Sequence, residues 1–166
     1  AGRQVAVGFK KQFMPANRKA GKLMREHIGE LRMITARYPQ RLPEQEEMTT
    51  WLGGVACPGV RSFLDHLCHP SSMLVSWLGM PESLLFERSN KGCGRMSLRF
   101  ADGVLADLAL TTGAAADGGL ESSMIIGSGA HIFVDDCLRV ELRRDDPNRR
   151  YGRTLDSYGA EPGVAS

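Results

Sequence analysis

Apolar residues recur at steps of three and four along residues 59–79, the spacing that predicts a helix with one face in the core. Polar residues form a ridge beside this stripe, and Gly79 followed by Pro81 is a typical helix end. Pro70 lies inside the helix, where the loss of one backbone hydrogen bond predicts a kink. The stripe consists of Val60, Phe63, Leu64, Leu67, Cys68, Ser71, Val75 and Leu78, and the ridge of Ser62, Asp65, His69, Ser72 and Ser76.

A second helix is predicted to begin at Pro15 and to stop at Gly29, because proline suits the first helical position and glycine the position after the last turn. The apolar run 4–9 and the run 30–38 predict strands. Between these helices, the polar, acidic stretch 41–50 is interpreted as a long surface loop.

Alternating apolar and polar residues predict a series of strands in the second half of the chain. Asp102-Gly103 is typical of a tight hairpin, and Gly127-Ser-Gly129 of a turn. The predicted strands are 82–88, 95–100, 104–112, 121–126 with its continuation 131–134, and 137–143, with a small-residue loop at 113–119.

Early helices followed by a meander of strands favour an α+β fold: a predominantly antiparallel, open-faced sheet with helices packed on one face. Residues 1–144 are predicted to form this domain, and residues 145–166 a loosely held tail or linker. Leu105 and Ala109 fall on the other face of the sheet, which predicts that this face meets a second sheet in an oligomer. The chain starts without Met and reaches an apolar run within five residues, which we interpret as a segment of a longer polypeptide.

The composition excludes several classes of partner. A net charge of +2 over 166 residues, without a basic tract, argues against nucleic acid as a partner. No apolar run approaches the roughly 18 residues that a membrane span needs, and no signal peptide is visible. The four cysteines are scattered, which predicts reduced thiols in a cytoplasmic protein.

Asp65 and His69 are the strongest candidates for chemistry. They are four residues apart, so a helix places them one turn apart on the same face, where a carboxylate can orient an imidazole and raise its basicity. From spacing alone, an exposed ion pair worth about a few tenths of a kcal/mol is the simpler interpretation.

Other groups of residues give weaker evidence of a functional site. His66, Cys68 and His69 point in different directions around the helix, so a zinc site is not expected and no metal is predicted. Lys10 and Lys11, at the end of the first predicted strand, could bind an anion or simply be solvated. The turn at residues 127–129 lacks the spacing and the following helix of a dinucleotide-binding loop.

The order of four segments resembles the C-terminal domain of the glucose–fructose oxidoreductase/inositol dehydrogenase (Gfo/Idh/MocA) family, which has a dihydrodipicolinate-reductase-like fold. The resemblance covers roughly residues 5–143. The segments are VGFKKQFMPA (7–16), HIGELRMITARYP (27–39), GVRSFLDHLCHPSSMLVSWLGMPESL (59–84) with its D-x-x-x-H motif on Asp65 and His69, and the strands LRFADGVLADLAL and IIGSGAHIFVDD.

This resemblance implies an oxidoreductase that uses NAD or NADP on a hydroxyl or carbonyl of a sugar, polyol or related small molecule. His69 would take or return the hydroxyl proton, and Asp65 would hold the substrate hydroxyl or the imidazole. Lys11, Tyr38 and Arg61 are the candidate substrate contacts. The family's sheet implies a homo-oligomer assembled through the open face.

The chain departs from the family pattern at positions that matter for cofactor binding and for the substrate. It contains neither the glycine fingerprint nor the Glu-Lys-Pro motif of the family's N-terminal Rossmann domain, so the cofactor would be bound mainly by a domain absent from this chain. We therefore expect no cofactor-binding residues here and an inactive isolated fragment. Arg61 replaces a family glycine and favours an acidic substrate. A catalytically silent ligand-binding or assembly module of the same fold is the alternative, and a metal-dependent hydrolase is a third interpretation.

Overall fold

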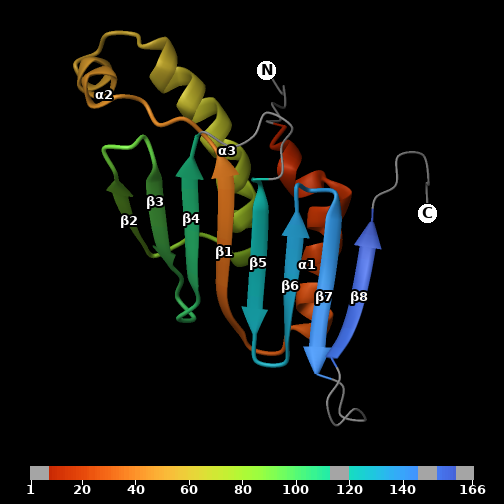
Figure 1. Cartoon of the computed structure of the whole chain (residues 1–166). Helices are drawn as coiled ribbons and strands as arrows, with labels where there is room; N and C mark the ends of the chain where they lie inside the picture. The colour runs from red at the N-terminus through yellow and green to blue at the C-terminus, as the bar shows by residue number, and fades with distance from the viewer. Residues whose placement is uncertain (1–7, 113–119, 146–152, 160–166) are drawn as a thin grey trace, which may run out of the picture.

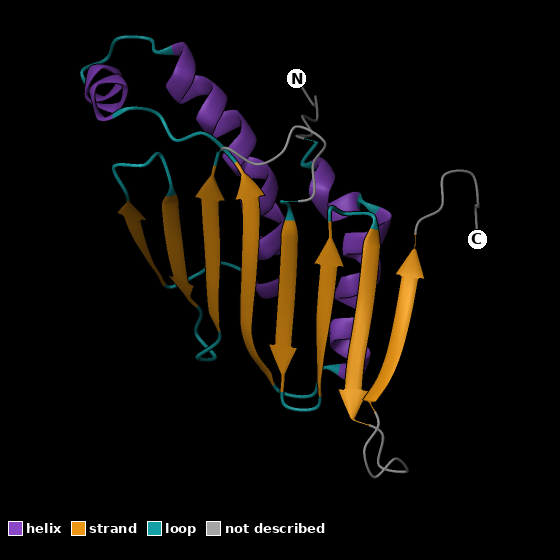
Figure 2. Ribbon diagram, in the orientation of Figure 1, coloured by secondary structure: helices purple, strands orange, loops and turns teal. Residues whose placement is uncertain are grey.

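The structure is a computed structural model that describes residues 8–112, 120–145 and 153–159; of residues 145 and 153–159 only the backbone is described. It consists of one large sheet with helices behind it (Figures 1 and 2). The helical elements are η1 (Lys10–Phe13), α1 (Pro15–His27), α2 (Gln45–Leu52) and α3 (Pro58–Leu78). The strands are β1 (Leu31–Pro39), β2 (Ser83–Arg88), β3 (Gly94–Arg99), β4 (Leu105–Thr111), β5 (Ser122–Gly127), β6 (Ala130–Asp135), β7 (Arg139–Asp145) and β8 (Arg153–Gly159).

The strands form an eight-stranded sheet in the order β2-β3-β4-β1-β5-β6-β7-β8. Only β1 and β4 pair in parallel; the other neighbours are antiparallel, which confirms the predicted open, predominantly antiparallel sheet. The early strand β1 lies at the centre because it pairs with β4 on one side and β5 on the other, so the two halves of the meander flank it.

The helices α1 and α3 both cover one face of the sheet, as predicted (Figure 1). Helix α1 packs on β6 and β7 and buries Leu23 and Met24 there. Because side chains alternate along a strand, one set from every central strand meets these helices. That set forms the core, whose fully buried members include Ile34, Leu108, Leu110, Ile125, Ile132 and Leu142.

Close backbone packing explains two of the glycines. Gly29 follows α1 with a φ of +69°, the left-handed conformation expected at the helix end. Gly127, the last residue of β5, faces the backbone oxygen of Ile28, and a Cβ at this position would collide with it. The end of α1 is thereby pressed against the β5–β6 turn.

The predicted surface loop at 41–50 is wrong over most of its length, because α2 occupies residues 45–52. Its start carries a capping box: Glu44 accepts a hydrogen bond from the third helical residue, and the Glu47 carboxylate accepts one from the Glu44 N–H at 2.7 Å. Arg88 donates to the Pro43 carbonyl and thereby ties this start to β2. A Glu in place of the usual Ser, Thr, Asp or Asn cap hid the signal.

The structure also corrects the tail. Residues 153–159, within the segment predicted as a loose extension, form β8, which pairs antiparallel with β7 along Arg139–Asp145. This edge strand therefore belongs to the sheet. Most of the strand predicted at 4–9 and the small-residue loop at 113–119 lie outside the described residues.

Helix α3 spans 21 residues and continues through Pro70, whose ring is buried. It also begins at Pro58, so the Cys57-Pro-Gly segment forms the helix start, where the missing N–H of proline is not needed. The predicted stripe is correct in part. Val60 is buried, but Leu64 and Val75 are 43% and 38% exposed, and the fully buried Leu74 lies outside the predicted stripe, so the face that meets the core differs from the one its periodicity suggests.

Candidate functional site

Helix α3 places Asp65 and His69 on the same side, one turn apart, with Asp65 exposed and His69 half-buried. The two side chains make no direct hydrogen bond or ion pair with each other among the described contacts. The Cys68 thiol donates to the Asp65 carbonyl at 2.8 Å, and its sulfur lies 3.9 Å from His69 Nδ1. The carboxylate therefore acts on the imidazole through space and leaves it available to another partner.

The short helix η1 packs against α3 and brings two lysines toward His69. Desolvation lowers the pKa of His69, the positive charges of Lys10 and Lys11 lower it further, and Asp65 opposes them. A lowered pKa favours the neutral imidazole near neutral pH, which is the form that accepts a proton.

Lys11 does not project freely into solvent. Its ammonium donates to Glu121 Oε2 at 2.5 Å, lies 3.6 Å from the Cys137 sulfur and sits 5.5 Å from the centre of the Tyr38 ring. The Lys11 and Glu121 side chains are only 12% and 16% exposed. Lys11 and Tyr38, two predicted substrate contacts, are thus brought together, but the Lys11 charge is already paired.

Two residues of this arrangement, Glu121 and Cys137, were not singled out from the sequence. The Cys137 thiol donates to Glu121 Oε1 at 2.9 Å, and burial together with this carboxylate raises the pKa of the thiol to about 11. Asn17, at the start of α1, donates to the Lys11 carbonyl at 2.8 Å and lies 3.6 Å from the Cys137 sulfur. The sequence gives no signal for this cluster, because its members lie on segments that only the fold brings together.

Arg61, the third predicted substrate contact, is exposed on α3, about two turns before His69. A cavity of about 360 Å³ lies between η1 and α3, alongside Cys68. It is lined by Phe9, Gln12, Cys68, Ser71, Ser72, Val75 and Ser76. Neither His69 nor Lys10 lines this cavity, although Cys68 in its wall directly precedes His69, and Arg61 lies farther along the helix.

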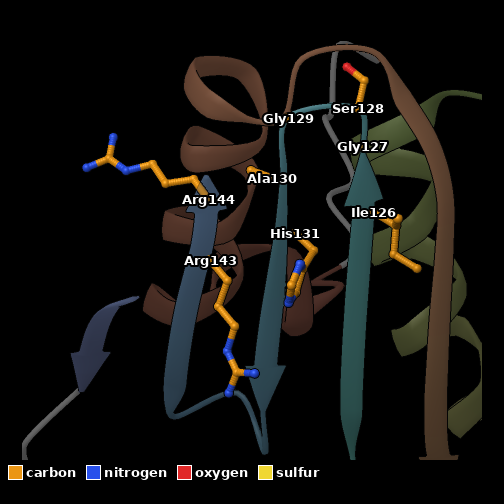
Figure 3. A pocket seen from close by; sticks show the side chains of 8 residues that line it. All are labelled: Ile126, Gly127, Ser128, Gly129, Ala130, His131, Arg143 and Arg144. Carbon is orange, nitrogen blue, oxygen red and sulfur yellow. The ribbon is translucent and has the colours of Figure 1, made fainter. Parts of the chain in front are cut away.

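The glycine turn at residues 127–129 is not a phosphate loop. It leads directly into β6, and it borders a cavity of about 210 Å³ with His131, Arg143 and Arg144. Figure 3 shows that Arg143 and Arg144 extend in different directions and that Ser128 lies at the far end of the cavity. Arg143 also donates to Glu141 at 3.2 Å, and Ser128 accepts a hydrogen bond from the Glu30 N–H, so these groups do not converge on a ligand.

Within residues 8–112, 120–145 and 153–159, no group of three or more His, Cys, Asp or Glu side chains is arranged to hold a metal ion. In the same ranges, no helix has the length and apolarity required to cross a membrane. The four cysteines are free thiols, and Cys137 is the buried one.

No family model and no curated protein sequence matches this chain. Solved structures do match its fold. Levoglucosan dehydrogenase in complex with NADH and L-sorbose superposes with a TM-score of 0.71 at 17% identity, over 94% of this chain and 47% of that chain. The WlbA dehydrogenase from Bordetella pertussis, in complex with NADH and UDP-GlcNAcA, gives 0.64 at 15% identity, over 84% and 44%.

These structures are Gfo/Idh/MocA-type oxidoreductases. The chain has the α+β fold of their C-terminal domain. The same fold occurs in a super-repressor mutant of Gal80p from Saccharomyces cerevisiae, with a TM-score of 0.67 at 10% identity, over 97% of this chain and 47% of that chain. The chain spans about half the length of the matched structures.

Proposed function

We propose that this chain is the substrate-binding and oligomerisation domain, over residues 1–144 together with the edge strand β8, of an NAD(P)-dependent oxidoreductase. The substrate would be a sugar, a polyol or a related hydroxy compound. The observation that carries the proposal is a half-buried imidazole, flanked by Lys10, Lys11 and Asp65, on a fold that dehydrogenases with bound NADH share.

In this proposal His69 accepts the hydroxyl proton during oxidation and returns it during reduction. Asp65, one turn away, orients the substrate hydroxyl and offsets part of the positive field of the lysines. Arg61 contacts a more distant part of the substrate. Tyr38 closes the site from the sheet side, and Lys11 contributes its charge.

The described residues do not fit a pyridine nucleotide by themselves, because the two Gly-x-Gly turns among them, at 92–94 and 127–129, both lead into strands, and Arg143 and Arg144 diverge beside the second. Another domain would have to bind the cofactor, so we expect the isolated chain to be inactive. Determining the coding sequence upstream of Ala1 tests this: a strand followed by a Gly-x-Gly-x-x-Gly turn is expected, and a start codon next to Ala1 would contradict it.

His69→Ala in the intact enzyme tests the catalytic assignment. We expect turnover to fall by at least about 10²-fold, the usual contribution of a general base, when NAD(P)H formation is followed with sugars, polyols and sugar acids. His27→Ala is the matched control, since this histidine is the last residue of α1 and is not among the groups that act on His69, so its loss should leave turnover near normal. Near-normal turnover of His69→Ala would remove His69 from the mechanism.

The open face of the sheet is our candidate for the contact between copies of the chain. Register places Met33, Leu105, Met124, Ile126 and Phe133 side by side on it, and Leu105 and Met124 are 41% and 37% exposed. A continuous apolar patch on a sheet face is typical of a protein–protein contact. Light scattering should show an oligomer that Met124→Lys converts to a monomer with unchanged circular dichroism; a wild-type monomer would refute this.

The alternative is a catalytically silent module of the same fold. The match to a Gal80p super-repressor favours it, because the name of that protein denotes a repressor, and so does the lack of direct contact between Asp65 and His69. This alternative predicts binding of a small molecule without NAD(P)H formation, whichever residue stands at position 69.

A further inference from the structure

A polar cluster lies beside the proposed site, and Lys11 is its one member that takes part in the mechanism above. It consists of Lys11, Asn17, Glu121 and Cys137, drawn from η1, α1, the segment before β5 and the turn before β7. Lys11 donates to one carboxylate oxygen of Glu121 at 2.5 Å, and Cys137 donates to the other at 2.9 Å. Both oxygens are thus occupied by donors that lie mostly out of water.

The turn that carries Cys137 has an unusual backbone conformation, and the cluster leaves one buried polar atom unpaired within the described part of the chain. Asp136 and Cys137 are the central residues of a turn closed by the hydrogen bond from the Leu138 N–H to the Asp135 carbonyl, and both have positive φ, +47° and +57°, a conformation that is uncommon for residues other than glycine. Asn17 is 1% exposed, and its Oδ1 has no hydrogen-bond partner among the described residues. Apolar side chains in a similar volume would often be at least as stable as a buried ion pair. Stability alone is therefore a weak reason for the arrangement.

The cluster determines where the Lys11 charge lies relative to His69. The ammonium is held against the Tyr38 ring and the Cys137 sulfur instead of following a flexible side chain through solvent. The preceding residue, Lys10, is exposed and belongs to the same short helix, so η1 presents one held and one solvent-exposed cation to α3. The groups that act on His69 are Lys10 and Lys11 from η1, and Asp65, His66 and the adjacent Cys68 on α3 itself.

We propose that Glu121 is a positioning residue: by holding Lys11 and neutralising part of its charge, it sets how strongly η1 opposes a proton on His69. This rests on the proposed role of His69 as the base. Without the carboxylate, the full charge of Lys11 would act on the imidazole, and without Lys11 the imidazole would lose one of its two cationic neighbours.

The test is a proton titration of His69 by NMR in the full 166-residue chain, with His27 and His131, which are not among the groups that act on His69, as internal references. Glu121→Gln keeps an oxygen for Lys11 but removes the charge, so the His69 midpoint is expected to move to lower pH. Lys11→Met removes the cation, so the His69 midpoint is expected to move to higher pH. The double variant Lys11→Met/Glu121→Gln is expected to lie between the two, because the field of a pair is smaller than the field of either charge.

Glu121→Asp should restore much of the wild-type midpoint, since it keeps the charge. If the Glu121→Gln and Lys11→Met midpoints both coincide with that of the wild type, the proposal is overturned and Glu121 only fastens η1 to the sheet. If Glu121→Gln does not fold, the double variant compared with Lys11→Met decides: a lower midpoint in the double variant supports a role for the Glu121 charge, and equal midpoints overturn the proposal.

The same variants in the intact enzyme give a second measurement. The acid limb of kcat/KM should shift to lower pH with Glu121→Gln and to higher pH with Lys11→Met. The titration does not depend on turnover, so the two proposals fail separately. If the midpoints shift but His69→Ala has normal turnover, His69 is not the catalytic base, although Glu121 and Lys11 still act on it. If the midpoints do not shift and His69→Ala is inactive, His69 is the base and the proposed role of Glu121 is refuted.

Discussion

The two faces of the sheet differ although they are made by the same strands. On the covered face, Ile125 is completely buried beneath the helices, whereas its neighbour Met124 on the open face is 37% exposed. The open face is nevertheless apolar at its centre, where Met33 stands opposite Leu105 and Ile126. Toward its edges it carries ion pairs, such as Arg95–Asp107 at 2.8 Å and Arg139–Glu141 at 2.6 Å. One face therefore holds the domain together, and the other has the composition of a surface that meets a partner.

Ile125→Ala and Met124→Ala test this difference within one strand. Ile125→Ala removes fully buried atoms and leaves a cavity, so the free energy of unfolding in urea should fall by roughly 2–5 kcal/mol. Met124→Ala should cost less than about 1 kcal/mol in the dissociated chain. Measurement at several protein concentrations sharpens the comparison, because a Met124→Ala loss that grows with concentration shows the open face covered by a second copy. Equal, concentration-independent losses would contradict the assignment of the two faces.

The fold could be predicted largely from local patterns in the sequence. The β4 alternation of Leu108 and Leu110 with Asp107 and Ala109 identified the covered face, and Pro15 and Gly29 fixed the ends of α1. Helix α2 was missed because its cap is a Glu and it buries no residue, so it has no strong apolar period. Strand β8 was missed because it is an edge strand in a polar segment, and its pairing with β7 is a tertiary property.

The candidate site could be predicted only in part. Asp65 and His69 lie on one helix, so their spacing alone places them on one face, and the structure agrees. Lys11 was noticed as a cation, but its partner Glu121 is 110 residues away in the sequence. No local sequence pattern predicts that two residues so far apart will meet. Their contact depends on the strand order of the sheet, in which β1 lies between β4 and β5.

The polar cluster on the covered side predicts a loss of stability in alkali. Burial raises the pKa of Cys137 from its ordinary value near 9 to about 11, and burial raises the pKa of Tyr38 as well. The pKa of Lys11 is also raised: burial lowers it, but Glu121 more than compensates. A group whose pKa is raised by folding stabilises the protein fully below its unfolded pKa and loses that contribution as the pH rises through its folded pKa. For Cys137 alone, the free energy of unfolding should therefore fall by roughly 2–3 kcal/mol between pH 9 and 11.

Urea unfolding at half-unit steps from pH 8 to 11 measures this loss, and Cys137→Ser is the matched variant. Its hydroxyl can still donate to Glu121 but does not ionise in this range, so its stability should decline less steeply than that of the wild type. The thiols of Cys57, Cys68 and Cys93 are only half-buried, and Cys93→Ser is the control that should leave the slope unchanged. Parallel slopes for the wild type and Cys137→Ser would show that the buried thiol does not hold its proton more tightly in the folded chain. The difference between the covered face and the open face would then be one of apolar packing alone.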